Sequence, residues 1–82
     1  MTNTIYAGWM NDIQKALVGK KIVEVAYLPV ADLEEWGWSK SPIVLTLDDG
    51  TVLIPQMDDE GNDGGALWTS DEGLGVIGVI TN

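Results

Sequence analysis

No cysteine and no histidine occur in this chain of 82 residues. A domain of this length buries only about 60 to 65% of the surface of its unfolded chain, and small domains usually gain stability from a disulfide, a metal ion or a partner subunit. Disulfides are impossible here, and zinc sites built on sulfur or nitrogen ligands are excluded. We therefore expect the chain to associate with further copies of itself.

The charge of the chain excludes several functional classes. Four lysines, no arginine and thirteen acidic residues give a formal net charge of −9, which excludes a simple cationic nucleic-acid binder. Without imidazole, thiol or guanidinium groups, acid–base and oxyanion chemistry lacks its usual side chains. We expect no enzyme, no catalytic residue and no cofactor. No apolar run approaches a membrane span and no signal peptide is evident, so we expect a cytoplasmic protein without membrane contact.

Apolar residues repeat with a helical period at the start of the chain. They predict a helix over about residues 4–18, with Asn3 or Thr4 as its cap. Gly19 stands where a left-handed residue ends a helix. Four apolar residues share one face of this helix: Ile5, Trp9, Ile13 and Leu17.

Five short strands are expected after this helix. They cover residues 22–28, 43–47, 51–54, 66–69 and 75–80. Asp48, Asp49 and Gly50 supply a tight turn between the second and third strands. Residues 31–41 show no clear period, and we expect a loop there with one helical turn at most. The pattern predicts one domain over residues 1–82, of α+β to mostly β class, with a strongly bent antiparallel barrel at about 22–80.

The order of these elements resembles the Sm/LSm family of small SH3-like barrels. Residues 17–25 (LVGKKIVEV) are similar to the family's helix end, Gly-Lys pair and first strand, and residues 47–50 fall where the family places the aspartate-containing loop of its first Sm motif. The Asn expected after that loop and the family's Arg-Gly pair are missing. The resemblance implies a five-stranded barrel in a homo-oligomeric ring that acts as an RNA-binding or RNA-processing scaffold.

Ring formation in this family pairs the sheet edge of one protomer with that of the next, which removes exposed strand edges. We expect the last strand at that interface; in a monomer it would be an ordinary core strand. The interface residues expected are Val76, Ile77, Val79 and Ile80.

Three of the four lysines are candidates for contact with single-stranded RNA or DNA. Lys15, Lys20 and Lys21 gather near the end of the helix and the start of the first strand. In a ring they would repeat as a basic annulus that contacts phosphates. Alternatively, they complement the helix dipole and solubilise the helix.

Two further groups complete the candidate nucleic-acid site. Asp48, Asp49 and Gly50 would accept hydrogen bonds from a base edge, or they form a turn and nothing more. Trp36 and Trp38 would point the same way from an extended segment and stack a base, or they fill the core.

The acidic residues leave two other interpretations open. The acidic, arginine-free style is similar to small marine cyanophage proteins; the carboxylates at 58–63 and 71–72 would then bind a basic host protein, by nucleic-acid charge mimicry. Asp58, Glu60, Asn62 and Asp63 alternate as calcium ligands do, but Asp63 stands where an EF-hand needs Gly. We expect a solvated loop and no metal site.

Overall fold

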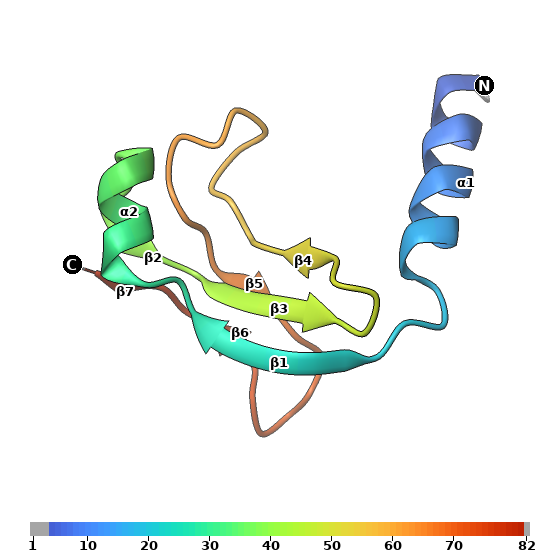
Figure 1. The fold of residues 1–82 in the computed structure, drawn as a ribbon. Helices are drawn as coiled ribbons and strands as arrows, with labels where there is room; N and C mark the ends of the chain where they lie inside the picture. The colour runs from blue at the N-terminus through green and yellow to red at the C-terminus, as the bar shows by residue number, and fades with distance from the viewer. Residues whose placement is uncertain (1–3, 82) are drawn as a thin grey trace.

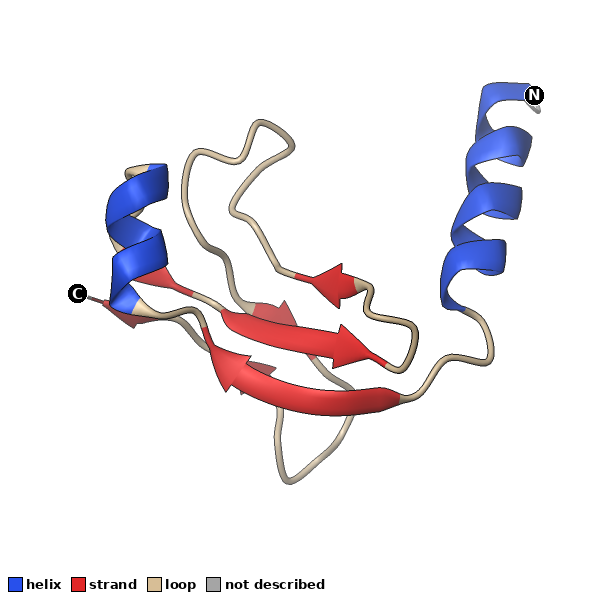
Figure 2. Cartoon of the chain, in the orientation of Figure 1, coloured by secondary structure: helices blue, strands red, loops and turns tan. Residues whose placement is uncertain are grey.

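The computed structural model describes residues 4–81 as an open α+β fold of two helices and seven short strands (Figures 1 and 2). The α+β class is therefore confirmed. Asn3, one of the two expected caps, lies outside the described residues. The elements are α1 (Thr4–Leu17), β1 (Ile22–Tyr27), α2 (Val30–Trp36), β2 (Lys40–Ser41), β3 (Ile43–Leu47), β4 (Val52–Leu53), β5 (Leu67–Trp68), β6 (Val76–Ile77) and β7 (Ile80–Thr81).

The largest sheet has the strand order β1-β3-β4 and is antiparallel throughout. β1 lies at its edge, with Tyr27 opposite Ile43. The hairpin predicted between β3 and β4 is confirmed: the Leu47 amide donates to the Thr51 carbonyl oxygen at 2.8 Å. Gly50 takes φ = +91° in its turn, a conformation that glycine adopts without steric cost.

The remaining strands form two small pairs, β2 with β7 and β5 with β6. The last predicted strand is split at Gly78, because its two halves, β6 and β7, pair with different partners. Among residues 4–81 the strands thus make three separate small sheets, and these sheets do not close into the expected barrel. Tyr27 links β1 to the segment between β6 and β7, since its hydroxyl donates to the Gly78 carbonyl oxygen at 3.1 Å.

Helix α2 is longer than the single turn expected in this region. It begins after Pro29, whose carbonyl oxygen accepts from the amides of Asp32 and Leu33 at 3.0 and 3.2 Å. It ends at Gly37, which has φ = +73°, as a left-handed C-terminal residue should. Seven residues are too few to establish a helical period in the sequence, although proline before and glycine after them are the ordinary boundary signals.

The core lies beneath α2. Leu33 is fully buried and packs with Leu28 and Trp38, and half-buried Val44 and Ile54 extend this cluster across the sheet. Ser41 is buried beside it, and its hydroxyl donates to the Leu28 carbonyl oxygen at 2.6 Å. The apolar core is therefore concentrated where α2 meets β1 and β3.

Helix α1 stands away from this core. In Figure 1, α1 and α2 rise from opposite ends of the same side of the β1-β3-β4 sheet. The Cα radius of gyration is 14.6 Å, whereas a compact domain of this length has about 12 Å. The described chain contains no helix with the length and apolarity that crossing a bilayer requires.

Candidate functional site

Lys20 joins helix α1 to the turn between β3 and β4. Its Nζ donates to the Ala16 carbonyl oxygen at 3.0 Å and to Asp49 Oδ2 at 2.7 Å. Asp49 Oδ1 accepts from the Thr51 amide at 3.0 Å. Hydrogen bonds from the Lys20 side chain and then from Thr51 hold the pKa of Asp49 far below its ordinary value of 3.8. Lys20 and Asp49 therefore form an exposed ion pair, the Lys20 clamp, that connects the end of α1 to the sheet.

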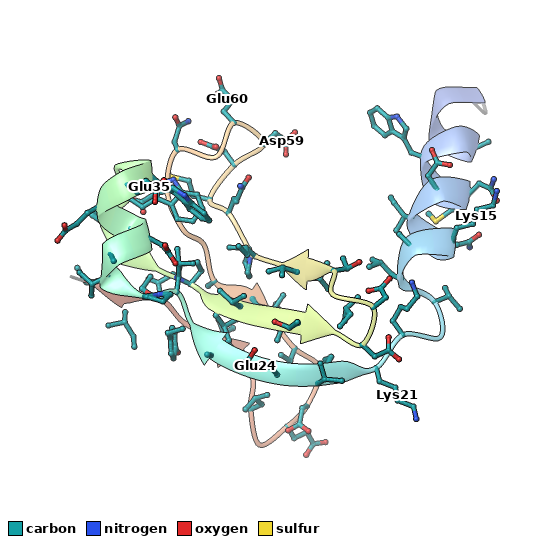
Figure 3. The ribbon with its side chains drawn as sticks, in the orientation of Figure 1. Lys15, Lys21, Glu24, Glu35, Asp59 and Glu60 are labelled. Carbon is teal, nitrogen blue, oxygen red and sulfur yellow. The ribbon has the colours of Figure 1, made fainter. Side chains whose placement is uncertain are left out.

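The other two lysines of the predicted cluster are exposed. Figure 3 shows Lys15 on the side of α1 that faces away from α2, and Lys21 just before β1. The structure thus brings the three lysines to the same end of the molecule as the 48–50 turn. One of the three charges is balanced by Asp49, which leaves Lys15 and Lys21 as the more accessible cations of this end.

The two tryptophans do not extend from one strand as predicted. Trp36 ends helix α2 and is 45% exposed, whereas Trp38 is only 8% exposed. Their rings meet edge to face with centroids 4.9 Å apart, and Trp38 Nε1 donates to the Gly61 carbonyl oxygen at 2.8 Å. The expectation that Trp38 stacks a base is wrong, because this side chain belongs to the core. Trp36 keeps an accessible ring face.

The predicted nucleic-acid residues therefore do not form one site. The lysines and the 48–50 turn lie beside α1, while Trp36 lies on α2 at the opposite end of the sheet (Figure 1). Gly50 and Asp49 are used to build the turn and the clamp. A ligand bound by both groups would have to extend across the whole sheet.

The predicted interface residues are only partly covered. Val76 and Ile80 are exposed, whereas Ile77 and Val79 are half-buried. Strand β6 pairs with β5 on one side, and β7 pairs with β2. Each of these two-stranded sheets leaves its outer edges unpaired within residues 4–81, so strand addition from another chain is geometrically open.

The acidic loop after β4 is closed by its own carboxylates. Asp58 accepts from the amides of Glu60 and Asn62 at 3.0 and 3.2 Å and from Asn62 Nδ2 at 2.7 Å. The Asn62 hydrogen bonds are the main reason that the pKa of Asp58 lies below its ordinary value. The Asp58 carboxylate is therefore occupied in shaping the loop.

Asp63 fastens this loop to the segment before β2. It accepts hydrogen bonds from the Ser39 hydroxyl at 2.8 Å and from the Lys40 amide at 2.9 Å. Partial burial raises the pKa of Asp63, but the hydrogen bonds from Lys40 and Ser39 outweigh that effect and lower it. The next residue must be glycine, because a Cβ at Gly64 would collide with the Lys40 carbonyl oxygen and with Pro42. The sequence predicts a solvated loop here and does not reveal this structural role, which depends on contacts with Ser39 and Lys40.

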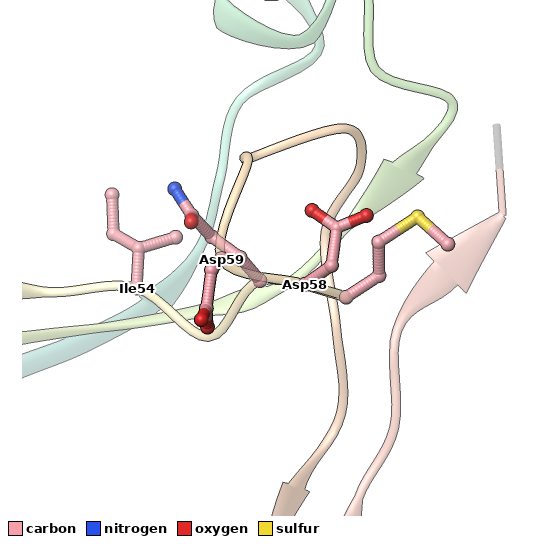
Figure 4. A pocket seen from close by; sticks show the side chains of 5 residues that line it. Ile54, Asp58 and Asp59 are labelled. Carbon is pink, nitrogen blue, oxygen red and sulfur yellow. The ribbon is translucent and has the colours of Figure 1, made fainter.

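An open pocket of about 540 Å³ lies at the start of the loop, lined by Ile54, Gln56, Met57, Asp58 and Asp59. Figure 4 shows the carboxylates of Asp58 and Asp59 directed away from each other. Over residues 4–81, no three acidic, histidine or cysteine side chains are grouped as metal ligands. The pocket therefore presents separate carboxylates and a methionine, not a converging set of ligands.

An apolar groove, which the sequence does not predict, runs between α2 and the sheet. Its volume is about 290 Å³. Ala26, Val44, Val52 and Ile54 are among the apolar side chains that line it, while Glu24 and Asp32 are its acidic groups. The alternation of side chains along β1 and β3 predicts which residues of each strand share a face. The groove also requires β1 to pair with β3, and this pairing joins residues far apart in the sequence.

No protein-family model, curated protein or solved structure matches this chain. The resemblance to Sm-like proteins consequently rests on residues 17–25 and 47–50 and on the order of the elements.

Proposed function

We propose that this protein is a non-catalytic subunit of a homo-oligomer that serves as a binding scaffold. One observation carries the proposal: the chain exposes 6069 Å² to solvent, whereas a folded monomer of 8.8 kDa exposes about 4,800 Å². The difference is roughly 1,300 Å² per chain, or about 2,600 Å² for two chains. Obligate homodimers bury about 2,000 to 5,000 Å².

The exposed surface is apolar where a soluble monomer would bury it. Val23 and Val25 on edge strand β1 are more than half exposed, as is Val76 on β6. Hydrophobic surface of this kind is stabilised by roughly 25 cal/mol per Å² when another chain covers it. In the Sm-like assembly that we propose, copies complete a five-stranded barrel and a ring through the free edges of β1, β6 and β7.

Native mass spectrometry tests the assembly directly. Self-association predicts a mass that is a multiple of 8.8 kDa. A mass of one chain under gentle conditions, over micromolar to millimolar concentrations, would contradict the proposal. The mass also gives the number of copies.

Single-stranded RNA or DNA is the ligand that we propose for this scaffold, bound at the lysine end. In support, Lys15 and Lys21 are exposed at the same end of the molecule as the 48–50 turn, and assembly would repeat them around one face. Because the chain carries a net charge of −9, binding should be weak and should fall steeply with salt.

Fluorescence anisotropy with a labelled single-stranded RNA at low and moderate salt tests this ligand. Lys21→Glu should abolish the anisotropy change, whereas the matched reversal Lys40→Glu, which lies on β2 beside α2, should leave most of it. Equal loss from both variants would indicate a general charge effect, and no binding by the parent chain would remove nucleic acid from the proposal.

A basic protein is the second candidate ligand, and the tip of the acidic loop favours it. Figure 3 shows Asp59 and Glu60 at this tip, directed outward, while Asp58 and Asp63 hold the loop in shape. A preorganised loop presents its outward carboxylates at low entropic cost. Retention of a purified basic protein by the parent chain, and its loss with Asp59→Asn plus Glu60→Gln, would support this candidate; retention by both would refute it.

A further inference from the structure

Helix α1 carries an apolar face that is directed toward the space above the sheet. Figure 3 shows Lys15 on the side of α1 remote from α2. Ile13 lies about 160° around a helix from Lys15, because successive residues turn by about 100°, so it faces toward α2. Ile13 is 50% exposed and Met10 is 56% exposed. The helix makes no extensive contact with another element of the described chain.

The groove beside α2 is a complementary surface. Apolar residues from three strands line it, together with Asp32 and Trp36 of α2. An amphipathic helix binds to such a groove through residues spaced three or four apart, as Met10, Ile13 and Leu17 are. The Lys20 clamp holds the end of α1 to the 48–50 turn, and in this position α1 does not reach the groove of its own chain.

Charge is divided between the same two parts of the chain. Residues 1–21 hold three lysines and one aspartate, a net charge of +2, whereas residues 22–82 hold one lysine and twelve acidic residues, a net charge of −11. The groove itself carries Glu24 and Asp32 and no basic residue. The opposite net charges of these two parts favour the approach of the α1 end of one copy to the body of another, while the face of Met10 and Ile13 itself supplies apolar contact.

From these observations we infer that α1 of one copy binds in the groove between α2 and the β1-β3-β4 sheet of a second copy. The inference rests on the self-association proposed above and names its contact. It also accounts for the area: the surface in excess of a compact monomer is about 1,300 Å² per chain, which is ample for an exchanged helix together with a strand edge.

Disulfide trapping tests the contact, because the parent chain contains no cysteine. One chain carries Ile13→Cys on α1, and a second, tagged chain carries Ala26→Cys in the groove. On mixing and mild oxidation, a disulfide-linked heterodimer should form. Two controls move one cysteine to the opposite surface: Asn11→Cys on the far side of α1, and Val25→Cys on the other face of β1. Each control should give at least about tenfold less heterodimer, since Cα atoms more than about 7 Å apart cannot be bridged.

Four outcomes would overturn the inference. If a single chain carrying both Ile13→Cys and Ala26→Cys forms an internal disulfide and the mixed chains do not, α1 packs on its own sheet. Equal heterodimer from the test pair and the controls would show random collision. If no heterodimer forms while native mass spectrometry still finds an oligomer, the copies meet elsewhere, and the proposed self-association survives. A single-chain mass would remove both proposals.

Discussion

The two helices of this protein differ in length and have opposite surroundings. Helix α2, with seven residues, buries Leu33 completely against Leu28 and Trp38. Helix α1, with fourteen residues, leaves Met10 and Ile13 half exposed or more. Helical stability in proteins comes mainly from packing of an apolar face. The shorter helix is thus stabilised within the chain, whereas Met10 and Ile13 of the longer one stay exposed in it.

Removing the centre of the packed region should have the largest effect. Leu33→Ala leaves a cavity where no solvent reaches, and such truncations cost about 2 to 5 kcal/mol of unfolding free energy. Urea unfolding measures the loss. Leu74→Ala is the matched control, because Leu74 is exposed in the turn before β6, and it should cost less than about 0.5 kcal/mol. Similar losses from both variants would show that the core is not centred beneath α2.

A charge on the apolar face of α1 should weaken self-association and leave the stability of the fold unchanged. Ile13→Glu removes apolar area from the contact and adds a carboxylate that would have to be desolvated. The free energy of association should become less favourable by about 2 kcal/mol, which is a roughly 30-fold higher dissociation constant. Dilution measured by light scattering gives the change in dissociation constant. Asn11→Glu adds the same charge on the opposite side of α1 and should weaken association far less. Equal weakening would assign the effect to net charge.

The buried hydroxyl of Ser41 tests the core beneath α2 with a smaller expected loss of stability. Ser41→Ala removes its 2.6 Å hydrogen bond to the Leu28 carbonyl oxygen inside the core, and leaving such an acceptor unpaired costs about 1 to 2 kcal/mol. Thermal unfolding compared with exposed Ser70→Ala reports the difference. No difference between the two serines would mean that the Leu28 carbonyl oxygen finds another donor.

Acid should weaken the Lys20 clamp and the acidic loop, and this effect should be the smallest of the four predicted here. The pKa values of Asp49, Asp58 and Asp63 are lowered from 3.8 in the folded chain. The unfolded chain therefore binds protons first, and the stability that these carboxylates add is complete above their unfolded pKa and is lost as pH falls through the folded values.

Melting temperatures between about pH 5 and pH 1 measure this loss. Asp49→Asn should make the decline shallower, because the group that is protonated has been removed. Asp59→Asn, at the outward tip of the acidic loop, should leave the slope unchanged. An unaltered slope with Asp49→Asn would show that the clamp with Lys20 does not persist in solution.

Local parts of the fold could be predicted from the sequence, and long-range parts could not. The 4–17 helix and the 43–53 hairpin follow from periodicity and from Gly19 and Gly50, both of which take positive φ. Those signals act within a few residues. The split of the last strand at Gly78 depends on pairing with β2 and β5, and no local pattern specifies those partners.

The candidate site was harder to predict for the same reason. The clustering of lysines was visible in the sequence, but the pairing of Lys20 with Asp49 joins residues 29 positions apart. The sequence left Trp38 as either a base-stacking or a core residue, because its burial depends on α2 and on the Gly61 carbonyl oxygen. The groove is composed of three strands and a helix, so it exists only after these have assembled.

Sedimentation equilibrium of the purified chain at several loading concentrations tests the central claim most directly. We expect a particle whose mass is a multiple of 8.8 kDa and which dissociates on dilution more readily with Ile13→Glu than with Asn11→Glu. A folded, heat-stable particle of 8.8 kDa at every concentration would contradict it, since α1 would then need no second copy.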